Sequence, residues 1–444
     1  MSVGEASTGS RPFLTLLDPR AKIRGSRDPL GLQPLWTFLG RQIVQNLTTV
    51  TVSLRGFTTF LLGMCFAQTE VDDRGRDEDD LVQVFLKTEQ LAAYSRVAKE
   101  RGLSGTQDDL EIRGIQRAQR NLREGHVHIS SGERWQILAD QRTYGLWGLY
   151  TTASRNSGLL DRARPRLSLE AADFVEENYL PRLPGKGEAV RSFLGRDRDF
   201  SPMGKDSGLA ESLADLLGPK LTPAERDFYK SHLVTACNAE GLQARTWNLI
   251  QEANPTMQDL IRPFSMAELR RIIQKCARKG DVELLEKLEA IHNVELVIAP
   301  LGQLFSFVLS RDDQSLTGVA REVREAWKDM PKVLPVERFE AALQKAQSVL
   351  EEEQVHMLSR LARLVAEVDY AEAIRILIEQ NEAVMKARGG GPWVAIKGTR
   401  LDVRLPDERG DLPAGRELKN LWVSTYFLNA LKAIGAAIVK GSGV

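Results

Sequence analysis

Apolar residues at helical spacing constrain the fold of this chain more than any other feature of its sequence. Between residues 335 and 368 they recur every three or four positions, and residues 370–386 continue the pattern. Such spacing gives each helix one apolar face, and two helices joined by a short turn pack as an antiparallel pair. Shorter runs with this spacing occur along most of the chain, so the sequence predicts a mainly α, multi-helical, multidomain protein.

Two segments depart from the simple helical pattern. Residues 393–396 and 400–405 alternate in polarity around Lys397-Gly398, which predicts a small C-terminal β-hairpin. Residues 130–183 combine a helix, a glycine-rich aromatic segment, a basic loop and a helix start at Ser168. This order is typical of a winged helix and predicts a winged-helix-like element. A helical subdomain of another kind is the alternative interpretation.

The length of 444 residues predicts several domains. We expect an N-terminal helical domain over residues 1–126 and a winged-helix-like domain over 127–185. A central helical domain follows over 186–330. The long helical hairpin, the β-hairpin and the last helix then form a domain over 331–444.

The composition limits which partners the protein can attract and in which cellular compartment we expect it. Lysine plus arginine equals aspartate plus glutamate at 60 each, so no global field draws the chain to DNA or to an anionic membrane. The N-terminus shows no signal-peptide pattern, and the longest apolar run is too short to span a bilayer. The three cysteines are far apart and predict neither disulfides nor a zinc site, which fits a reducing cytoplasm. Spacing gives no reason for His232, Cys237, Cys276 and His292 to converge.

Arginines concentrate between residues 113 and 166, and the first of them are spaced so that they share one helix face. Guanidinium groups suit bidentate contact with phosphates, and aromatic residues such as Trp135 and Trp147 are interleaved with them. The competing interpretation is a solvated surface over an aromatic core. The predicted nucleic-acid-binding residues are Arg113, Arg117, Arg120, Arg123, Arg142, Arg155, Arg162, Arg164 and Arg166.

A second candidate site follows from hydroxyl groups just ahead of an apolar segment that we expect to be a helix from Arg55 to Phe66. Hydroxyls and backbone amides at a helix start suit an anion, so Thr48, Thr49 and Arg55 are candidate phosphate-binding residues. No GxxxxGK[ST] or GxGxxG pattern accompanies them. The alternative is a buried helical hairpin.

This region also resembles a known family. The pattern RDxLG followed by TTxTxxxRxF is similar to the N-terminal signature of an uncharacterised bacterial domain-of-unknown-function family associated with phage-defence gene regions. The resemblance implies an accessory component encoded near helicases and restriction-type genes, and it carries over no catalytic residue. The matching residues are Arg27, Asp28, Leu30, Gly31, Thr48, Thr49, Thr51, Arg55 and Phe57.

One enzymatic alternative deserves comparison with this interpretation. Asp402 or Asp407, together with Glu417 and Lys419, resembles a PD-(D/E)xK nuclease pattern. That chemistry requires the two acids to hold a metal ion and the lysine to lie beside the attacked phosphate. Here the segment 417–419 opens an expected helix, which does not suit a strand-borne metal site.

The sequence as a whole therefore predicts a non-catalytic, DNA-contacting or scaffolding subunit of a bacterial anti-phage defence complex in the cytoplasm. We expect no catalytic residues, no metal and no cofactor. The expected partners are other protein subunits, such as a helicase, ATPase or nuclease of the same system, and double-stranded DNA. The alternatives are a metal-dependent nuclease using Asp402, Asp407, Glu417 and Lys419, and a purely protein-binding helical adaptor.

Overall fold

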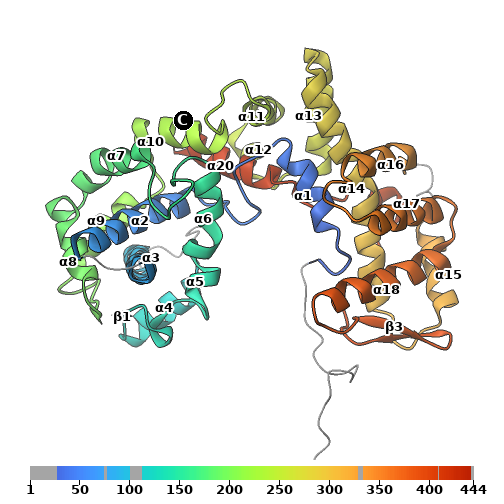
Figure 1. Ribbon diagram of the computed structural model, residues 1–444, viewed down its shortest axis with the longest axis horizontal. Coiled ribbons are helices and arrows are strands. Elements are labelled where there is room, and N and C mark those ends of the chain that lie inside the picture. The colour runs from blue at the N-terminus through green and yellow to red at the C-terminus, as the bar shows by residue number, and fades with distance from the viewer. Residues whose placement is uncertain (1–27, 75–77, 101–112, 329–333, 409, 442–444) are drawn as a thin grey trace, which may run out of the picture. The chain divides into compact units, whose positions relative to one another are not determined.

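The computed structural model describes residues 28–74, 78–100, 113–328, 334–408 and 410–441. It is mainly helical with a small C-terminal antiparallel hairpin, which confirms the predicted fold class. The chain divides into two compact units, drawn with their elements in Figure 1. The larger unit spans residues 40–264, 271–285 and 425–444, and the smaller unit spans 1–39, 265–270 and 286–424. Each unit therefore combines segments that are distant in sequence, unlike the four consecutive domains that we expected.

A helical hairpin forms the centre of the larger unit. It consists of α2 (Leu54–Arg74) and α3 (Glu78–Glu100). Phe60 of α2 and Phe85 of α3 are buried and meet edge to face, with ring centroids 5.2 Å apart. The expected helix from Arg55 to Phe66 is confirmed and continues to Arg74. The hydroxyl of Ser53 caps it by accepting a hydrogen bond of 3.0 Å from the backbone N–H of Gly56.

Further helices surround this hairpin, and a two-residue antiparallel pair joins β1 (His128–Ile129) to β2 (Arg198–Asp199). The other α-helices of the larger unit are α4 (Ile115–Glu124), α5 (Gln141–Tyr144), α6 (Leu146–Asn156), α7 (Leu169–Asn178), α8 (Glu188–Leu194), α9 (Ser207–Leu216), α10 (Pro223–Tyr229), α11 (Leu242–Ala253), α12 (Met257–Ile261) and α20 (Leu428–Lys440). A π-helix, Lys230–Val234, continues α10 directly.

The last helix, α20, belongs to the larger unit although it follows the whole smaller unit in sequence. Its Gly435 faces Trp247 of α11 so closely that a Cβ atom there would lie 2.3 Å from the indole ring. Only glycine allows this approach, because real Cβ contacts are never that short. The fit shows that α20 is part of the core of the larger unit.

Residues 127–185 hold the segment for which we predict a winged-helix-like element. The structure places β1, a 3₁₀ turn (Glu133–Trp135), α5, α6 and α7 there, with an isolated antiparallel bridge between Leu160 and Leu167. Ser168 caps α7 by accepting from the N–H of Ala171, as expected. However, β1 pairs with residues 198–199, outside the predicted domain. The winged helix stays a prediction.

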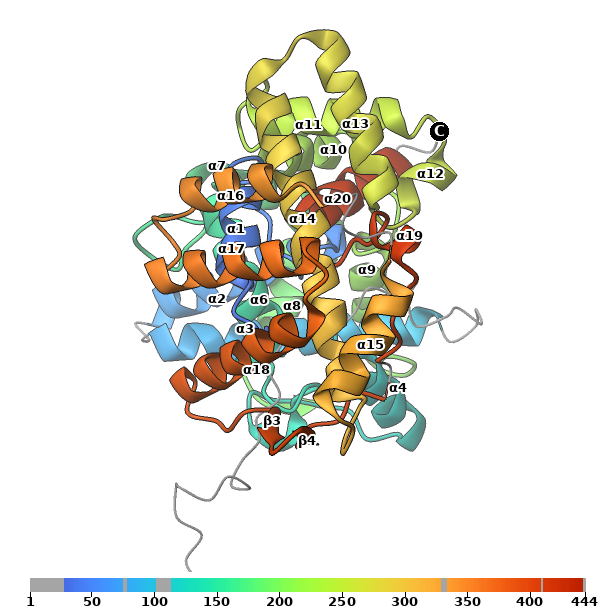
Figure 2. The ribbon, with the colours of Figure 1, turned by 90° about the vertical axis from the view of Figure 1, so that its right-hand side faces the viewer.

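The smaller unit is built from helices and the hairpin near its end. Figure 2 shows α16, α17 and α18 following one another, with β3 and β4 next to α18. The hairpin pairs Val394 with Val403 and Lys397 with Arg400, which confirms the predicted β-hairpin. Its elements are α15 (Leu316–Ala326), α16 (Val336–Lys345), α17 (Glu352–Ala366), α18 (Tyr370–Ala387), β3 (Val394–Lys397), β4 (Arg400–Val403) and α19 (Gly415–Leu418). Three more helices, α1 (Gln33–Arg41), α13 (Met266–Lys279) and α14 (Val282–Leu309), contribute residues to both units.

In the described part of the chain, α14 is the one helix that is long and apolar enough to cross a membrane. Its most apolar stretch is 72% buried within the protein, as the central helix of a packed core would be. Leu288, Ile291 and Leu304 are among its fully buried residues. Packing inside the protein therefore accounts for the apolar character of α14.

The segment that carries the first half of the family signature is anchored within the smaller unit. Asp28 accepts a hydrogen bond of 2.7 Å from the N–H of Leu32 and so caps α1. Asn381 of α18, which is fully buried, donates to the carbonyl of Pro29 and accepts from the N–H of Trp393. These contacts give Asp28 and its neighbours a structural role. Arg27 lies outside the described residues.

Candidate functional site

Helix α4 carries the first group of predicted arginines, and it is strongly amphipathic. Glycines with positive φ bound it at both ends, Gly114 at 71° and Gly125 at 75°. Its apolar face (Ile115, Ala118 and Leu122) is buried, and Asn121 donates a hydrogen bond of 2.8 Å to the hydroxyl of Tyr94 on α3. Arg117, Arg120 and Arg123 lie on the opposite face, as the spacing predicted, and Arg113 lies two residues before the helix begins. We call Arg113, Arg117, Arg120 and Arg123 the α4 patch.

In the described part of the chain, the guanidinium groups of the α4 patch form no ion pair with a carboxylate, although Arg113 borders the cavity that holds the buried carboxylate of Glu89. Within the described ranges, none of the four forms an ion pair, and Arg117 donates only to the backbone carbonyl of Arg134 at 3.3 Å. The guanidinium of Arg134 in turn lies 4.8 Å from the ring centroid of Trp135. Arg113, Arg120 and Arg123 are exposed. Among the described residues, Arg117, Arg120 and Arg123 therefore form a positive surface without ion-pair partners, with an aromatic ring beside it.

The other five predicted arginines lie elsewhere. Arg142 is 3.8 Å from the carboxylate of Asp79, and Arg166 forms a bidentate pair with Asp72 at 3.0 and 2.5 Å. Arg155 is half-buried in α6, whereas Arg162 and Arg164 are exposed on the loop before α7. Figures 1 and 2 both show α4 and α7 at opposite ends of the larger unit. The nine predicted arginines therefore do not form a single surface.

Arg55, a predicted phosphate ligand, points into the protein. Its Nε donates to the carbonyl of Gly218 at 2.7 Å, and its Nη2 donates to the carbonyl of Lys220 at 2.6 Å. Its Nη1 pairs with the fully buried carboxylate of Glu225 at 2.7 Å. Every nitrogen of the guanidinium is thus engaged inside the larger unit, which leaves none directed to an external phosphate.

The two predicted threonines are not brought to Arg55 by any contact in the described structure. The backbone N–H and the hydroxyl of Thr48 lie 2.8 and 3.2 Å from the hydroxyl of Thr51, so Thr48 stabilises its own turn. Thr49 is exposed. The cap of α2 comes from Ser53, one residue before the helix, because that position places a hydroxyl over the first free N–H groups.

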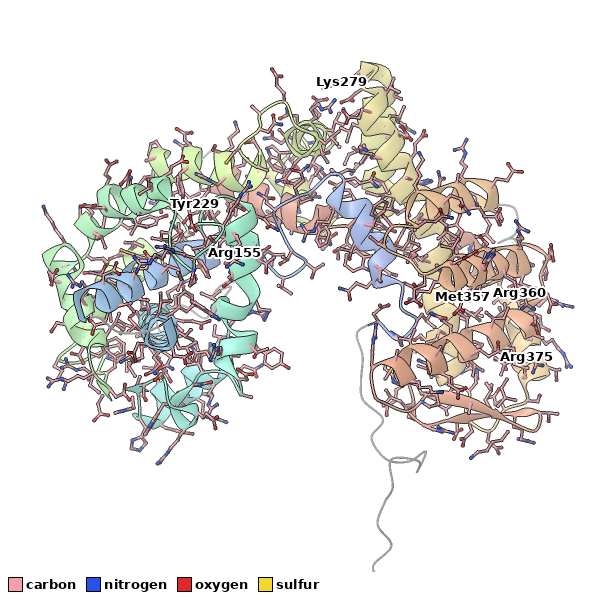
Figure 3. All side chains as sticks on the ribbon, in the orientation of Figure 1. Arg155, Tyr229, Lys279, Met357, Arg360 and Arg375 are labelled. Atoms are coloured by element: carbon pink, nitrogen blue, oxygen red, sulfur yellow. The ribbon has the colours of Figure 1, made fainter. Side chains whose placement is uncertain are left out.

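Hydroxyl groups extend the polar network around Arg55. The hydroxyl of Tyr229, labelled in Figure 3, lies 2.9 Å from Thr58 and 2.7 Å from the hydroxyl of Tyr179. Burial raises the pKa of Tyr229 to about 12 and that of Tyr179 well above its ordinary value. Both phenols are therefore neutral at physiological pH, and the network joins α2 to α10.

A small cavity beside α3 is lined by a buried acid, Glu89, which no sequence pattern singled out. The cavity measures about 30 Å³ and is bordered by Glu89, Arg96 and Arg113. Glu89 accepts hydrogen bonds of 2.8 Å from the N–H of Leu146 and from the side-chain amide of Gln141. Burial nevertheless raises the pKa of Glu89 to about 7, although those hydrogen bonds and the charge of Arg113 oppose the shift. The volume suits about one water molecule, so this is no substrate pocket.

The acids of the nuclease alternative each have a separate structural partner. Asp402 lies 3.0 Å from Lys397 and 3.3 Å from Arg404, and these cations lower its pKa, Lys397 most. Asp407 is hydrogen-bonded to the hydroxyl of Ser306. Glu417 caps its own helix through the N–H of Ala414. Among the residues that the structure describes, no three histidines, cysteines or acids are grouped to hold a metal ion.

The structure brings together two residues that we expected to remain apart. The Sγ of Cys237 lies 3.5 Å from Nδ1 of His232, because the π-helix and the turn after it fold the chain back on itself. Residues five apart do not share a face of an α-helix, so helical spacing gave no signal for this pair. Cys276, in contrast, is buried and donates to the carbonyl of Asp281.

No family model, curated protein or solved structure matches this chain. A function is therefore argued from the physical observations above.

Proposed function

We propose that this chain is a non-catalytic, nucleic-acid-contacting subunit of a bacterial anti-phage defence complex, and that double-stranded DNA binds at the α4 patch. The observation that carries the proposal is that Arg117, Arg120 and Arg123 form no ion pair with any carboxylate of the described residues. Arg142 and Arg166, which have such partners, show that this chain neutralises other arginines. The three arginines of α4, unpaired within the described structure, are therefore available to an external polyanion.

The geometry of the α4 patch suits a DNA strand. Arg117, Arg120 and Arg123 span six residues, a rise of about 9 Å along the helix. Duplex DNA presents one phosphate per roughly 3.4 Å of axis on each strand, so the three side chains can reach successive phosphates. Because the net charge of the chain is zero, the attraction is local and should be sensitive to salt.

The place in a defence complex is supported by the N-terminal signature and by the separate structural roles of the C-terminal acids. Asp402, Asp407 and Glu417 are each held by neighbours in the smaller unit, so we assign the chemistry of the complex to another subunit. A helicase, ATPase or nuclease of the same system fills that role in the proposal. We place the complex in the cytoplasm.

Fluorescence anisotropy with a labelled DNA duplex at low salt tests the DNA contact. The test variant carries Arg117→Glu, Arg120→Glu and Arg123→Glu. Its matched control carries Arg162→Glu, Arg164→Glu and Arg166→Glu, which changes the charge equally at the opposite end of the same unit. We expect the test variant to lose at least about tenfold in affinity, because each reversed phosphate contact costs binding energy. The control should bind like the wild type.

Equal losses in both variants would mean that binding is diffuse, and a loss confined to the control would move the interface to the loop before α7. If the wild type does not bind the duplex at low salt, the DNA contact is wrong. Co-purification from the bacterial host then tests the remaining part of the proposal, because a scaffolding subunit should still retain its enzymatic partner.

A further inference from the structure

Cys237, His232 and Glu170 form a chain of contacts in the larger unit, separate from the α4 patch. The Sγ of Cys237 is 3.5 Å from Nδ1 of His232, and Nε2 of the same ring is 3.2 Å from Oε1 of Glu170. His232 is 1% exposed, whereas the carboxylate of Glu170 is largely exposed and Cys237 reaches the surface. A buried imidazole thus connects a solvent-accessible thiol to a solvent-accessible acid.

The backbone at this thiol adopts an unfavourable conformation. Ala236 and Cys237 both adopt positive φ, 49° and 56°, although neither is glycine. Left-handed geometry is unfavourable for such residues and persists where surrounding contacts impose it. Here the N–H of Cys237 donates to the carbonyl of Ser231 at 2.8 Å, and the N–H of Thr235 donates to that of Lys230. Short π-helices often occur at functional sites.

The hydrogen bonds of His232 fix where its protons lie. Nδ1 is 2.8 Å from the carbonyl oxygen of Ser157, and since a carbonyl only accepts, Nδ1 carries a proton. Nε2 is buried and makes no hydrogen bond of good geometry, although Glu170 lies within ion-pair distance. Nδ1 lies near both the carbonyl oxygen of Ser157 and the sulfur of Cys237, so its N–H is shared between these two acceptors.

We propose that Cys237 is a thiol-modification site that reacts with small disulfides and that His232, held by Ser157 and Glu170, stabilises its thiolate. The thiol proton leaves to solvent, and the thiolate attacks one sulfur of R–S–S–R. A bond forms between the sulfur of Cys237 and that sulfur, the original S–S bond breaks, and the departing thiolate takes up a proton as R–SH. Cys237 is oxidised to the mixed disulfide while one R–S group is reduced, so electrons and atoms balance.

Glu170 has two opposing effects on the formation of the Cys237 thiolate, so a substitution of Glu170 tests the proposal. Burial raises the pKa of the Cys237 thiol, the negative charge of Glu170 raises it further, and a hydrogen bond with Ser231 lowers it. By its charge alone Glu170 should slow thiolate formation. By holding the imidazole of His232 in place, with its Nδ1 N–H beside the sulfur, it should assist the thiolate. The sign of the effect of Glu170→Gln therefore distinguishes an assisted thiol from one that is merely exposed.

The experiment uses the full chain and dithiodipyridine, an uncharged disulfide, with the release of pyridinethione followed by absorbance. Peptide mass mapping assigns the modified cysteine. We expect Cys237 to react at least about tenfold faster than Cys65, whose pKa burial raises to about 11, and than buried Cys276. Glu170→Gln should slow the reaction of Cys237 by about threefold or more. A rise of one unit in the pKa of the thiol lowers the thiolate fraction about tenfold, and the greater nucleophilicity of the more basic thiolate recovers about threefold of that loss. Cys237→Ser should abolish the fast phase.

Asp173→Asn removes the same charge from the same exposed side of α7 and serves as the matched control, with an expected rate equal to or above wild type. His232→Gln should slow the reaction at least as much as Glu170→Gln, and circular dichroism checks its folding. A rate that is unchanged or faster in Glu170→Gln would overturn the proposal, as would equal reactivity of all three cysteines. Incubation with oxidised glutathione should then give a mixed disulfide at Cys237 that a reductant reverses.

Discussion

The Nη1 atom of Arg55 lies 2.7 Å from Oε1 of Glu225, and both side chains are buried in the larger unit. Two backbone carbonyls and a second arginine, Arg182 at 3.5 Å from Oε2, complete the surroundings. Removing one member of a buried pair leaves an uncompensated charge in a poorly solvated site. This pair therefore joins the start of α2 to α10.

Arg55→Ala should destabilise the protein by about 3–5 kcal/mol, because Glu225 would lose its main partner. Urea denaturation monitored by circular dichroism measures the change. The control is Arg166→Ala, which breaks the exposed pair with Asp72 and should cost less than about 1 kcal/mol. Similar effects of the two substitutions would mean that burial does not set the energetic importance of Arg55.

Glu89→Gln should alter how stability depends on pH. Because burial raises the pKa of Glu89 to about 7, the folded protein holds this proton more tightly than the unfolded chain does. Its contribution is fully present below about pH 4.5 and is lost as the pH rises through about 7, a change of up to about 3 kcal/mol. Urea denaturation at a series of pH values should show this decline for the wild type and a flatter profile for Glu89→Gln. Parallel pH profiles for the wild type and Glu89→Gln would contradict the raised pKa of Glu89.

Asn381→Leu should destabilise the smaller unit by about 1–3 kcal/mol. The substitution removes the donor to the carbonyl of Pro29 and the acceptor for the N–H of Trp393, and it leaves both backbone groups without that partner. Hydrogen exchange at Trp393 measures the local effect. The neighbouring exposed Glu379 provides the control, because Glu379→Ala should change stability by less than about 0.5 kcal/mol.

The salt dependence of DNA binding should report how many arginines of the α4 patch meet phosphates. Each contact contributes roughly 0.9 to the slope of log affinity against log salt concentration. Replacing Arg117, Arg120 and Arg123 with glutamine should therefore lower the slope by about 2.7. Glutamine at Arg162, Arg164 and Arg166 should leave it unchanged. An unaltered slope in the first variant would show that these side chains make no phosphate contacts.

Sequence periodicity predicted the helices that have one continuous apolar face. The expected helix over 370–386 agrees closely with α18 (Tyr370–Ala387). The long run over 335–368 instead forms α16 and α17, because residues 346–350 turn and Glu351 begins the second helix with a capping box. Local caps and turns thus override a periodic pattern where two helices follow each other without a polar break.

The candidate sites were harder to predict because they depend on contacts between distant segments. Spacing correctly placed the arginines of α4 on one face, since that relation lies within a single helix. It could not show that Arg55 would be enclosed by residues 218–225, or that Arg166 would meet Asp72. Glu89 lies in a polar stretch of α3 between Thr88 and Gln90, and only the tertiary arrangement buries its carboxylate.

The position of α20 in the core of the larger unit has a consequence for synthesis on the ribosome. Residues 428–440 emerge only after the entire smaller unit has been translated, yet Gly435 must reach Trp247 before the larger unit is complete. The nascent chain must therefore keep the docking surface for α20 uncovered while about 150 further residues are made, at roughly 5–20 residues per second. During that interval the buried residues that α20 covers in the folded protein, Trp247 among them, remain without this cover.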